Sequence, residues 1–373
     1  MLKVQTREEP KYLTKLSQIP ELKETERIEL EAVTQKFVFR TNSYYQGLID
    51  WDDPHDPLRR IVMPDRNELA EWGELDASNE GKYTVVPGLE HKYGDTALLL
   101  VNDVCGAYCR FCFRKRLFMN DNDEVVRDVT AGIEYIRAHP EITNVLLTGG
   151  DPLLMSTPRL EAIIQPLREI EHVQIIRIGT KIPVFNPYRS LNDPTLGAML
   201  TRYSTAAKKI YIMAHFNHPR ELTPVAIAGL AQLRDAGAII VNQTPLIRGV
   251  NDNPATLTEL FDCLSFIGVP PYYVFQCRPT LGNQSYAVPL EAAFEIFLAA
   301  QTRAASGLAK RARFAMSHET GKLEVLALHA DHIYLRYHRA ADAENQGRLL
   351  VFKRNPDAYW LDDYLPSAAM RDS

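Results

Sequence analysis

Three cysteines with the spacing of a metal site dominate the chemistry of this sequence. Cys105, Cys109 and Cys112 lie within eight residues, and the whole chain holds only five cysteines. An iron–sulfur cluster of four irons is normally held by four cysteine thiolates, one on each iron. Three thiolates leave one iron open to a substrate or a cofactor. The spacing therefore predicts an iron–sulfur cluster with one open position.

Core thiols and a zinc site are the alternatives to a cluster at these three cysteines. Free cysteine is among the most buried residue types, so the three could be core thiols. A closed zinc site needs four ligands, usually in paired Cys-x-x-Cys halves, and no second half follows in the sequence. An odd number of cysteines argues against a disulfide framework and favours a reducing compartment.

A basic segment surrounds the last of these cysteines. Arg110 lies inside the motif, and Arg114, Lys115 and Arg116 follow it directly. We expect these side chains to place positive charge beside an anionic cluster and near any carboxylate that approaches it.

Composition excludes several classes of protein. The chain has 373 residues, 46% of them hydrophobic, and a net charge of -5, whereas nucleic-acid binding needs a clustered basic face. No apolar stretch reaches the about 20 residues of a membrane helix, and residues 1–9 lack the apolar core of a signal peptide. We expect a soluble, cytoplasmic protein with a small-molecule substrate and neither nucleic acid nor membrane as a partner.

Strand-like and helical segments alternate through the middle of the chain. Helical patterns such as 159–168 and 224–235 separate most of the strand-like segments, which predicts βαβ units and a parallel sheet. In α/β barrels the functional site lies at the C-terminal ends of the strands, where the cysteines and several polar motifs fall here. The expected strands are 97–101, 144–147, 173–178, 209–213, 238–241 and 272–275.

Different patterns flank this α/β region. Residues 10–80 look helical, with one buried face expected from Ile28, Leu30, Ala32, Val33, Phe37 and Val38. Alternating segments at 333–338 and 348–352 predict strands of a small C-terminal α+β unit, which we interpret as a lid or an oligomer contact. The predicted domains are 1–95, 96–300 and 301–373.

With Phe111 before its last cysteine, the Cys-x3-Cys-x2-Cys motif resembles that of radical S-adenosylmethionine enzymes, and further motifs resemble the lysine 2,3-aminomutase-like branch. The resemblance implies a partial (βα)6 barrel related to the TIM barrel, a [4Fe-4S] cluster on the three cysteines, S-adenosylmethionine at the open iron, and a reductant such as flavodoxin or ferredoxin. It covers most of the chain, through residues 47–50, 86–91, 147–152, 177–180, 215–219, 242–243, 248–252 and 271–273.

The same resemblance implies roles for individual residues. Gly149, Gly150 and Asp151 match the edge that binds the methionyl amino group, although an ordinary strand-to-helix turn has the same sequence. Lys322 matches the lysine that forms a Schiff base with pyridoxal 5′-phosphate (PLP), and burial would free its amine for that bond. Thr180, His215 and Gln243 are further cofactor contacts, Lys92 contacts the PLP phosphate, and Arg114 binds the substrate α-carboxylate.

The chain departs from this branch at several positions. Lys92 and Thr96 stand where the relatives place arginines for the PLP phosphate, and residues 317–321 replace a glycine-rich run before Lys322. Arg278 and Ala315 stand where the lysine-specific members use aspartates for the distal ammonium. An arginine attracts a carboxylate and repels an ammonium, so lysine is a poor candidate substrate. Asn253 stands at a zinc-ligand position of some relatives, and we expect no structural zinc.

Three functions are compatible with the sequence. The leading one is an isomerase that generates a 5′-deoxyadenosyl radical and moves an amino group between neighbouring carbons of an amino acid other than lysine. The second is a PLP-independent radical enzyme with an acidic substrate. The third is a non-catalytic iron–sulfur module for electron transfer.

Overall fold

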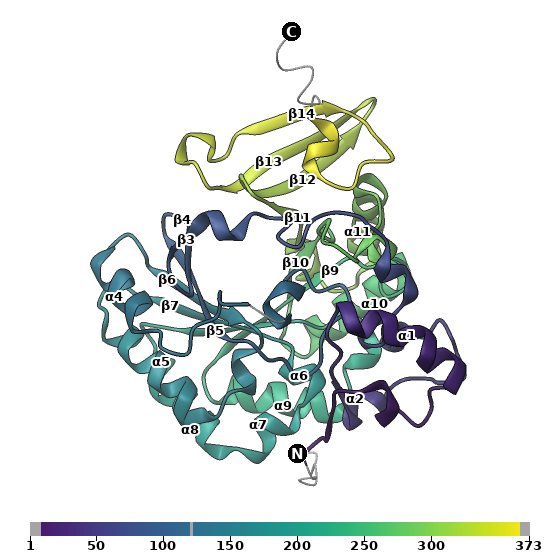
Figure 1. Ribbon diagram of the computed structural model, residues 1–373. Coiled ribbons are helices and arrows are strands. Elements are labelled where there is room, and N and C mark those ends of the chain that lie inside the picture. Colours follow the sequence, from purple (N-terminus) through teal and green to yellow (C-terminus); the bar gives the residue numbers. More distant parts are fainter. Residues whose placement is uncertain (1–8, 120–121, 366–373) are drawn as a thin grey trace.

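A single curled sheet of twelve strands forms the centre of the protein. The computed structural model describes residues 9–119 and 122–365, and its strands follow the order β14 to β3 without interruption. Seven consecutive strands, β5 to β11, are parallel, which confirms the predicted α/β class and its partial barrel (Figure 1). The six that the sequence predicted are β5 (Thr96–Asn102), β6 (Asn144–Gly149), β7 (Ile175–Thr180), β8 (Ile210–Ala214), β9 (Ile239–Pro245) and β10 (Pro271–Phe275).

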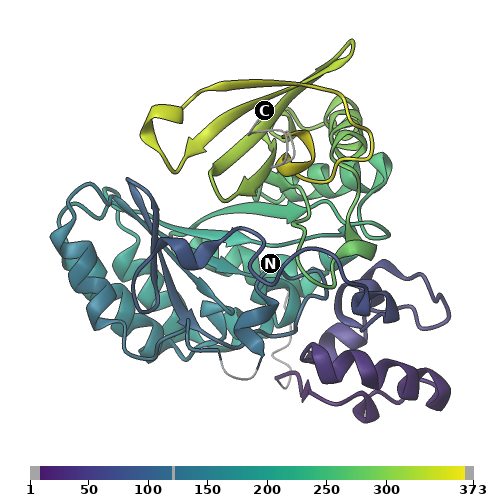
Figure 2. The same cartoon turned by 45° about the horizontal axis from the view of Figure 1, so that its top comes forward.

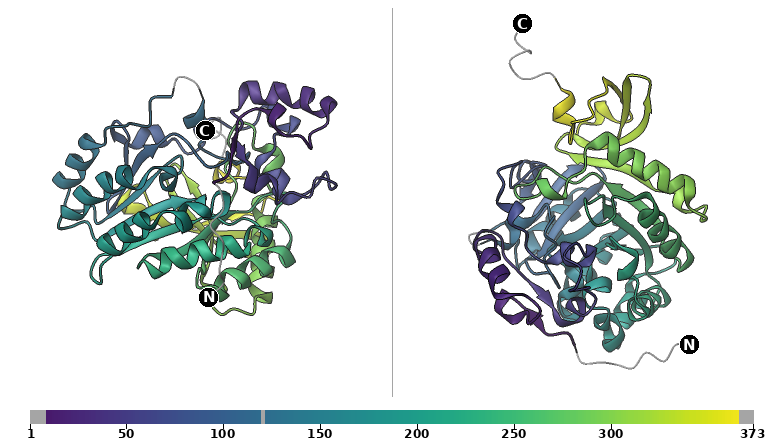
Figure 3. Two further views of the ribbon diagram at one scale, coloured as in Figure 1. Left: turned by 90° about the horizontal axis from the view of Figure 1, so that it is seen from below. Right: turned by 90° about the vertical axis from the view of Figure 1, so that its right-hand side faces the viewer.

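Helices cover the outer side of these strands (Figure 3). Alternate strand residues such as Val145 and Leu147 are fully buried under them, while Thr148 faces the barrel interior. Asp193, Thr223 and Asn253 cap three of the helices, so Asn253 has a local structural role at the former zinc position. The helices are α4 (Thr130–Ala138), α5 (Thr157–Glu169), α6 (Ile182–Phe185), α7 (Tyr188–Asn192), α8 (Pro194–Tyr203), α9 (Pro224–Asp235), α10 (Pro254–Phe266) and α11 (Leu290–Arg303).

The N-terminal part is only partly as predicted. It contains α1 (Glu24–Lys36), α2 (Ser43–Gln46), α3 (Pro57–Val62) and the short pair β1 (Tyr12–Leu13) and β2 (Thr41–Asn42). Leu30, Val33 and Phe37 are buried, but the expectation was wrong for Ala32, Ile28 and Val38, which are exposed. The apolar face of α1 is therefore narrow, and Val38 lies beyond the end of the helix.

Strands continue the sheet across both predicted domain boundaries. At one edge, β4 (Leu89–Tyr93) pairs antiparallel with β5 and β3 (Thr84–Val86) pairs antiparallel with β4, in a segment assigned above to the helical domain. At the other edge, β11 (Arg313–His318) pairs parallel with β10. The antiparallel strands β12 (Gly321–His329), β13 (His332–Ala340) and β14 (Leu349–Lys353) follow, and the alternating pattern predicted the last two of them.

The C-terminal strands lie over the barrel opening (Figure 2), where the segment before β3 is hydrogen-bonded to the end of β11 and to the turn after it. Ser78 Oγ donates to the carbonyl of Ser317 at 2.7 Å, and the Tyr83 hydroxyl donates to that of Glu319 at 2.7 Å. Side-chain hydrogen bonds therefore join the β11–β12 turn to the segment before β3.

None of the helices within 9–119 and 122–365 is long and apolar enough to cross a membrane. Of residues 1–9, which by sequence lack the apolar core of a signal peptide, residues 1–8 lie outside the described ranges.

A buried ion pair attaches the N-terminal helices to the cysteine segment. Glu68 accepts hydrogen bonds from Arg110 Nε at 2.9 Å and Nη2 at 2.8 Å, and neither side chain is exposed by more than 2%. Removing one partner of such a pair leaves an uncompensated buried charge, which costs about 3–5 kcal/mol.

We therefore predict that Glu68→Ala lowers the free energy of unfolding by about 3–5 kcal/mol in urea denaturation. Glu29→Ala is the matched control, because Glu29 pairs with Arg66 at 3.5 Å on the surface and such pairs contribute about 0–1 kcal/mol. Equal effects of the two substitutions would contradict this account of the pair.

Candidate active site

The segment from Cys105 to Cys112, here called the cysteine loop, follows β5 and is held by the N-terminal part of the chain. Tyr108 N donates to the carbonyl of Arg40 at 2.9 Å, and Arg110 N donates to that of Ile61 at 2.8 Å. The loop backbone is therefore fixed by residues that precede the barrel in sequence.

The three thiols suit a cluster better than a single ion. All three cysteines are partly exposed, and burial of the sulfur atoms raises the pKa of Cys109 to about 12 and those of Cys105 and Cys112 as well. Among the described residues, no three His, Cys, Asp or Glu side chains are gathered as ligands of one metal ion. Each cysteine of a cluster binds a different iron, so its ligands need not meet at one point. Binding would release the thiol protons.

Two glycines at the end of β6 lie against the backbone that leads into the cysteine loop, where a side chain has no room. Gly149 has a φ of 105°, and a Cβ atom there would lie 2.6 Å from the carbonyl oxygen of Asn102. A Cβ atom on Gly150 would lie 2.6 Å from both N and O of Val104. The sequence suggested that these glycines make room for a ligand, but the close approach is to the backbone just before Cys105. They fix the cysteine loop against the end of β6.

Asp151 joins the ends of β6 and β7. Its carboxylate accepts hydrogen bonds from Thr180 Oγ1 at 2.6 Å, from the backbone N–H of Lys181 at 2.7 Å, and from those of Leu153 and Ile182. Burial raises its pKa to about 6, against the effect of these donors. Both oxygens of Asp151 and the Thr180 hydroxyl are thus used within the chain, where they hold the glycine edge in place.

His215 and Gln243, predicted from separate strands, lie side by side. Their Nε2 atoms are 2.9 Å apart, so one ring nitrogen of His215 accepts from the Gln243 amide. Burial lowers the pKa of His215 to about 3, and the nearby Lys181 ammonium contributes. The imidazole is therefore neutral and available as a hydrogen-bonding group rather than as a charge.

The arginines of the basic segment are already paired with glutamates. Glu80 accepts from Arg114 Nε at 3.0 Å and Arg116 Nη2 at 2.9 Å, and Arg278 Nη1 lies 3.4 Å away. Although burial opposes ionisation, these guanidinium groups hold the pKa of Glu80 well below its usual range. Arg114 and Arg116 thus pair with Glu80, as Arg110 pairs with Glu68.

A second glutamate beside this group carries no charge at neutral pH. Burial and the Glu80 carboxylate raise the pKa of Glu90 to about 8, and Arg114 Nη2 lies 3.8 Å from Glu90 Oε1. Arg114 Nη1 also donates to Thr148 Oγ1 of β6 at 2.8 Å. Arg278, predicted as a substrate contact together with Arg114, stacks on the Phe113 ring at 3.6 Å. The structure thus places both predicted substrate residues around one carboxylate.

Lys322 lies inside the curled sheet, on β12. Its Nζ atom is 4.3 Å from the ring centre of Tyr273 and 5.1 Å from that of Phe275. Burial lowers the pKa of Lys322 well below its usual value, which favours the unprotonated, nucleophilic form of the amine. Four nearby cations lower this pKa further: Arg177, Arg339, Arg278 and Lys92.

Lys92 reaches this interior from the opposite edge of the sheet. Its Nζ atom donates to the carbonyl of His318 at 2.6 Å, and burial lowers its pKa to about 8. The predicted residues thus form two groups: one around the cysteine loop and the glycine edge, and one around Lys322. Arg278 belongs to the surroundings of both Glu80 and Lys322.

Sequence reasoning missed several residues of this interior. Arg177 had a readable signal, because it interrupts an otherwise apolar strand segment. Glu80 and Glu90 lie in a part of the chain that is charged throughout, and Arg339 lies in an alternating strand where arginine is unremarkable. Nothing in their spacing connects these three with the cysteines.

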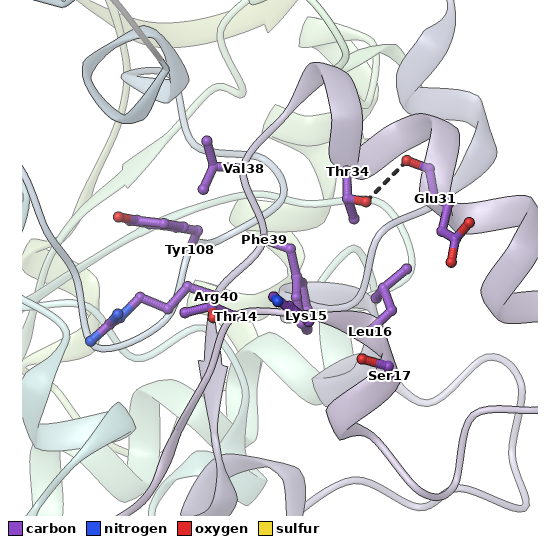
Figure 4. Close-up of a pocket in the computed structure, with 10 residues that line it drawn as sticks. All are labelled: Thr14, Lys15, Leu16, Ser17, Glu31, Thr34, Val38, Phe39, Arg40 and Tyr108. Carbon is purple, nitrogen blue, oxygen red and sulfur yellow. Dashed lines mark hydrogen bonds between the residues drawn. The ribbon is translucent and has the colours of Figure 1, made fainter.

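A cavity of about 440 Å³ lies apart from both groups (Figure 4). It lies between α1 and the segment from Thr14 to Ser17, and it touches the cysteine loop only through Tyr108. None of the predicted site residues lines it.

The comparisons with known proteins agree with this arrangement. The model of the radical SAM superfamily matches residues 99–261, which include the cysteine loop and β6 to β9. A chain of Aquifex aeolicus that carries a provisional L-lysine 2,3-aminomutase name is 59% identical over 355 residues, which cover 95% of each chain.

More distant relatives share a smaller part. The L-lysine 2,3-aminomutase of Fusobacterium nucleatum is 41% identical over 68% of this chain, and this chain spans only 59% of that enzyme. A solved radical SAM methyltransferase from Sphaerobacter thermophilus is 20% identical to this chain, with a TM-score of 0.42. The match covers 61% of this chain and 68% of the methyltransferase chain, and at this distance it supports no conclusion on function. On the identity and coverage of the Aquifex relative, the chain belongs to the lysine 2,3-aminomutase family of radical SAM proteins.

Proposed function

We propose that this protein is a radical aminomutase that acts on an amino acid other than lysine. In this proposal Cys105, Cys109 and Cys112 hold the [4Fe-4S] cluster that the radical SAM domain implies, and Lys322 attaches PLP. The observation that carries the proposal is the position of the partly buried Lys322 side chain, whose Nζ atom lies against two aromatic rings of β10 inside the sheet that also positions the cysteine loop.

The residues present fit both cofactors. The three thiols leave one iron open, and the Lys322 amine, whose pKa is lowered, lies in a cationic interior. When bound, the cluster with S-adenosylmethionine supplies a radical that removes a hydrogen atom, and PLP supplies a ring that stabilises a migrating amino group. The chain itself supplies orientation and exclusion of water. A flavodoxin or ferredoxin as reductant and a homo-oligomeric assembly remain parts of the proposal.

The chain's own residues position the substrate through charge. Arg114 and Arg278 converge on Glu80, while Glu90 is neutral, so this region keeps an excess of positive charge. A substrate carboxylate would share the guanidinium groups with Glu80 or take its place. An ammonium at the far end of a lysine substrate would meet Arg278, whose orientation is fixed by its stack on Phe113.

The second candidate is a PLP-independent radical enzyme that acts on an acidic substrate. The convergence of Arg114 and Arg278 favours it, because that charge pattern suits an acidic substrate whether or not PLP is present. A non-catalytic electron-transfer module, the third possibility, would use neither the arginines nor the buried lysine.

The cluster assignment predicts a selective loss of iron. Cys105→Ala, Cys109→Ala and Cys112→Ala should each reduce the iron of anaerobically reconstituted protein from about four per chain to near zero. Cys263→Ala and Cys277→Ala are the controls and should keep it, since both residues lie outside the loop. Full iron content in the variant that lacks all three loop cysteines would exclude this assignment.

The PLP assignment predicts covalent trapping at one residue. Borohydride reduction of the protein incubated with PLP should fix the cofactor on Lys322, identified by peptide mass spectrometry, and Lys322→Ala should abolish the added mass. Lys353→Ala, which removes an exposed lysine of β14, should trap as much as the unmodified chain. If no lysine gains the cofactor, the PLP-independent radical enzyme becomes the better assignment.

The substrate assignment predicts a preference for acids over lysine. Reduced, loaded protein should convert amino acids with a second carboxylate to β-amino acids at least about tenfold faster than lysine, because Arg278 distinguishes the two charges. Arg278→Gln should remove most of this preference. The measurement is product chromatography over a panel of amino acids, and efficient turnover of lysine by the unmodified chain would refute the assignment.

A further inference from the structure

Lys322 and Arg339 face the same interior because of strand register. They are directly opposite each other in the antiparallel β12–β13 pair, and opposite residues in such a pair point to the same side of the sheet. Arg177 of β7 and Lys92 of β4 approach the same space from other strands of the curled sheet. Three cations thus surround the amine that the proposed function assigns to PLP.

This positive charge is poorly balanced by the chain itself. Arg177 donates its Nε–H to the neutral Asn144 Oδ1 at 2.9 Å, and Lys92 donates to the backbone carbonyl of His318. Within the ranges that the structure describes, neither forms a salt bridge. Cations in an interior of low dielectric repel each other, and a bound anion with several acceptor oxygens would relieve that repulsion.

Arg339 reaches the beginning of β5, where Thr96 stands at a position for which the family resemblance implies an arginine. Its guanidinium contacts Asp95, donates to Thr96 Oγ1 at 3.0 Å and stacks on the Tyr93 ring at 4.4 Å. Asp95 is 62% exposed and lies at the rim, so it does not fill the interior side of this group. The planar fork of an arginine suits two oxygens of a phosphate at once.

We propose that Arg339, with Arg177 and Lys92, binds the phosphate group of the PLP attached to Lys322. The inference rests on the proposed function. Arg339, on β13, would then supply the positive charge that the neutral Thr96 cannot supply. The phosphate-binding arginine would lie on a C-terminal strand instead of at the beginning of β5.

The test compares two ligands that differ only in the phosphate. PLP and pyridoxal are titrated separately into anaerobically reconstituted protein, and binding is followed by absorbance and by borohydride trapping. Arg339→Gln should raise the Kd for PLP roughly tenfold or more, the usual effect of losing a hydrogen bond to a charged group, while the Kd for pyridoxal stays within about twofold. Arg177→Gln should act in the same direction.

Asp95→Asn is the matched control, because it removes the acidic partner of Arg339 but keeps the guanidinium. It should leave PLP binding unchanged or tighten it, with the melting temperature of each variant as a check on folding. If Arg339→Gln and Asp95→Asn weaken both ligands alike, Arg339 only ties β13 to β5 and the inference is overturned. PLP binding by Arg339→Gln equal to that of the unmodified chain overturns it too, while the proposed function stands. If the unmodified chain traps no PLP, the PLP step of the proposed function fails and this inference fails with it.

Discussion

The hydrogen bond from Lys92 Nζ to the carbonyl of His318 joins two distant strands of one sheet. β4 lies next to the edge strand β3, and His318 ends β11, the last of the seven parallel strands. This contact, with those of Ser78 and Tyr83, closes the opening that a six-stranded barrel would leave. Lys322 lies close to this contact in sequence, at the beginning of β12.

The curled sheet also brings several positively charged side chains close together in its interior. Arginines from β7, β13 and the end of β10 are brought together with Lys92 and Lys322. Near the cysteine loop, Glu80 balances part of this charge by binding three guanidinium groups. Around Lys322, within the described part of the chain, no comparable acid is built in. The difference between the two regions indicates where an anionic ligand belongs.

The fold was largely predictable because the spacing of apolar residues along the sequence indicates which residues are buried. Six apolar segments bounded by helical patterns gave the parallel strands, and alternation in 333–338 predicted β13. What failed depends on contacts distant in sequence. The pairing of β4 with β5, and of β3 with β4, overrode the helical prediction before residue 95, and the narrow contact surface of α1 left Ile28 exposed.

The candidate site was predictable where function requires a local motif. The cysteine spacing is such a motif, and the strand-end rule correctly brought His215 beside Gln243. The counter-charges were not predictable, since Glu68 and Glu80 meet Arg110 and Arg114 only after the N-terminal segment folds over the cysteine loop. Arg339 was missed for the same reason: only the register of β12 and β13 places it opposite Lys322.

The central claim is that one interior holds both the cluster and the lysine-bound cofactor. The most direct measurement is a crystal structure of the anaerobically loaded protein, with iron located by its anomalous scattering. The account predicts iron at the sulfur atoms of Cys105, Cys109 and Cys112, and cofactor density continuous with Lys322 Nζ in the same enclosed space. Iron elsewhere, or a cofactor bound on the outer surface while the interior around Lys322 stays empty, would contradict it.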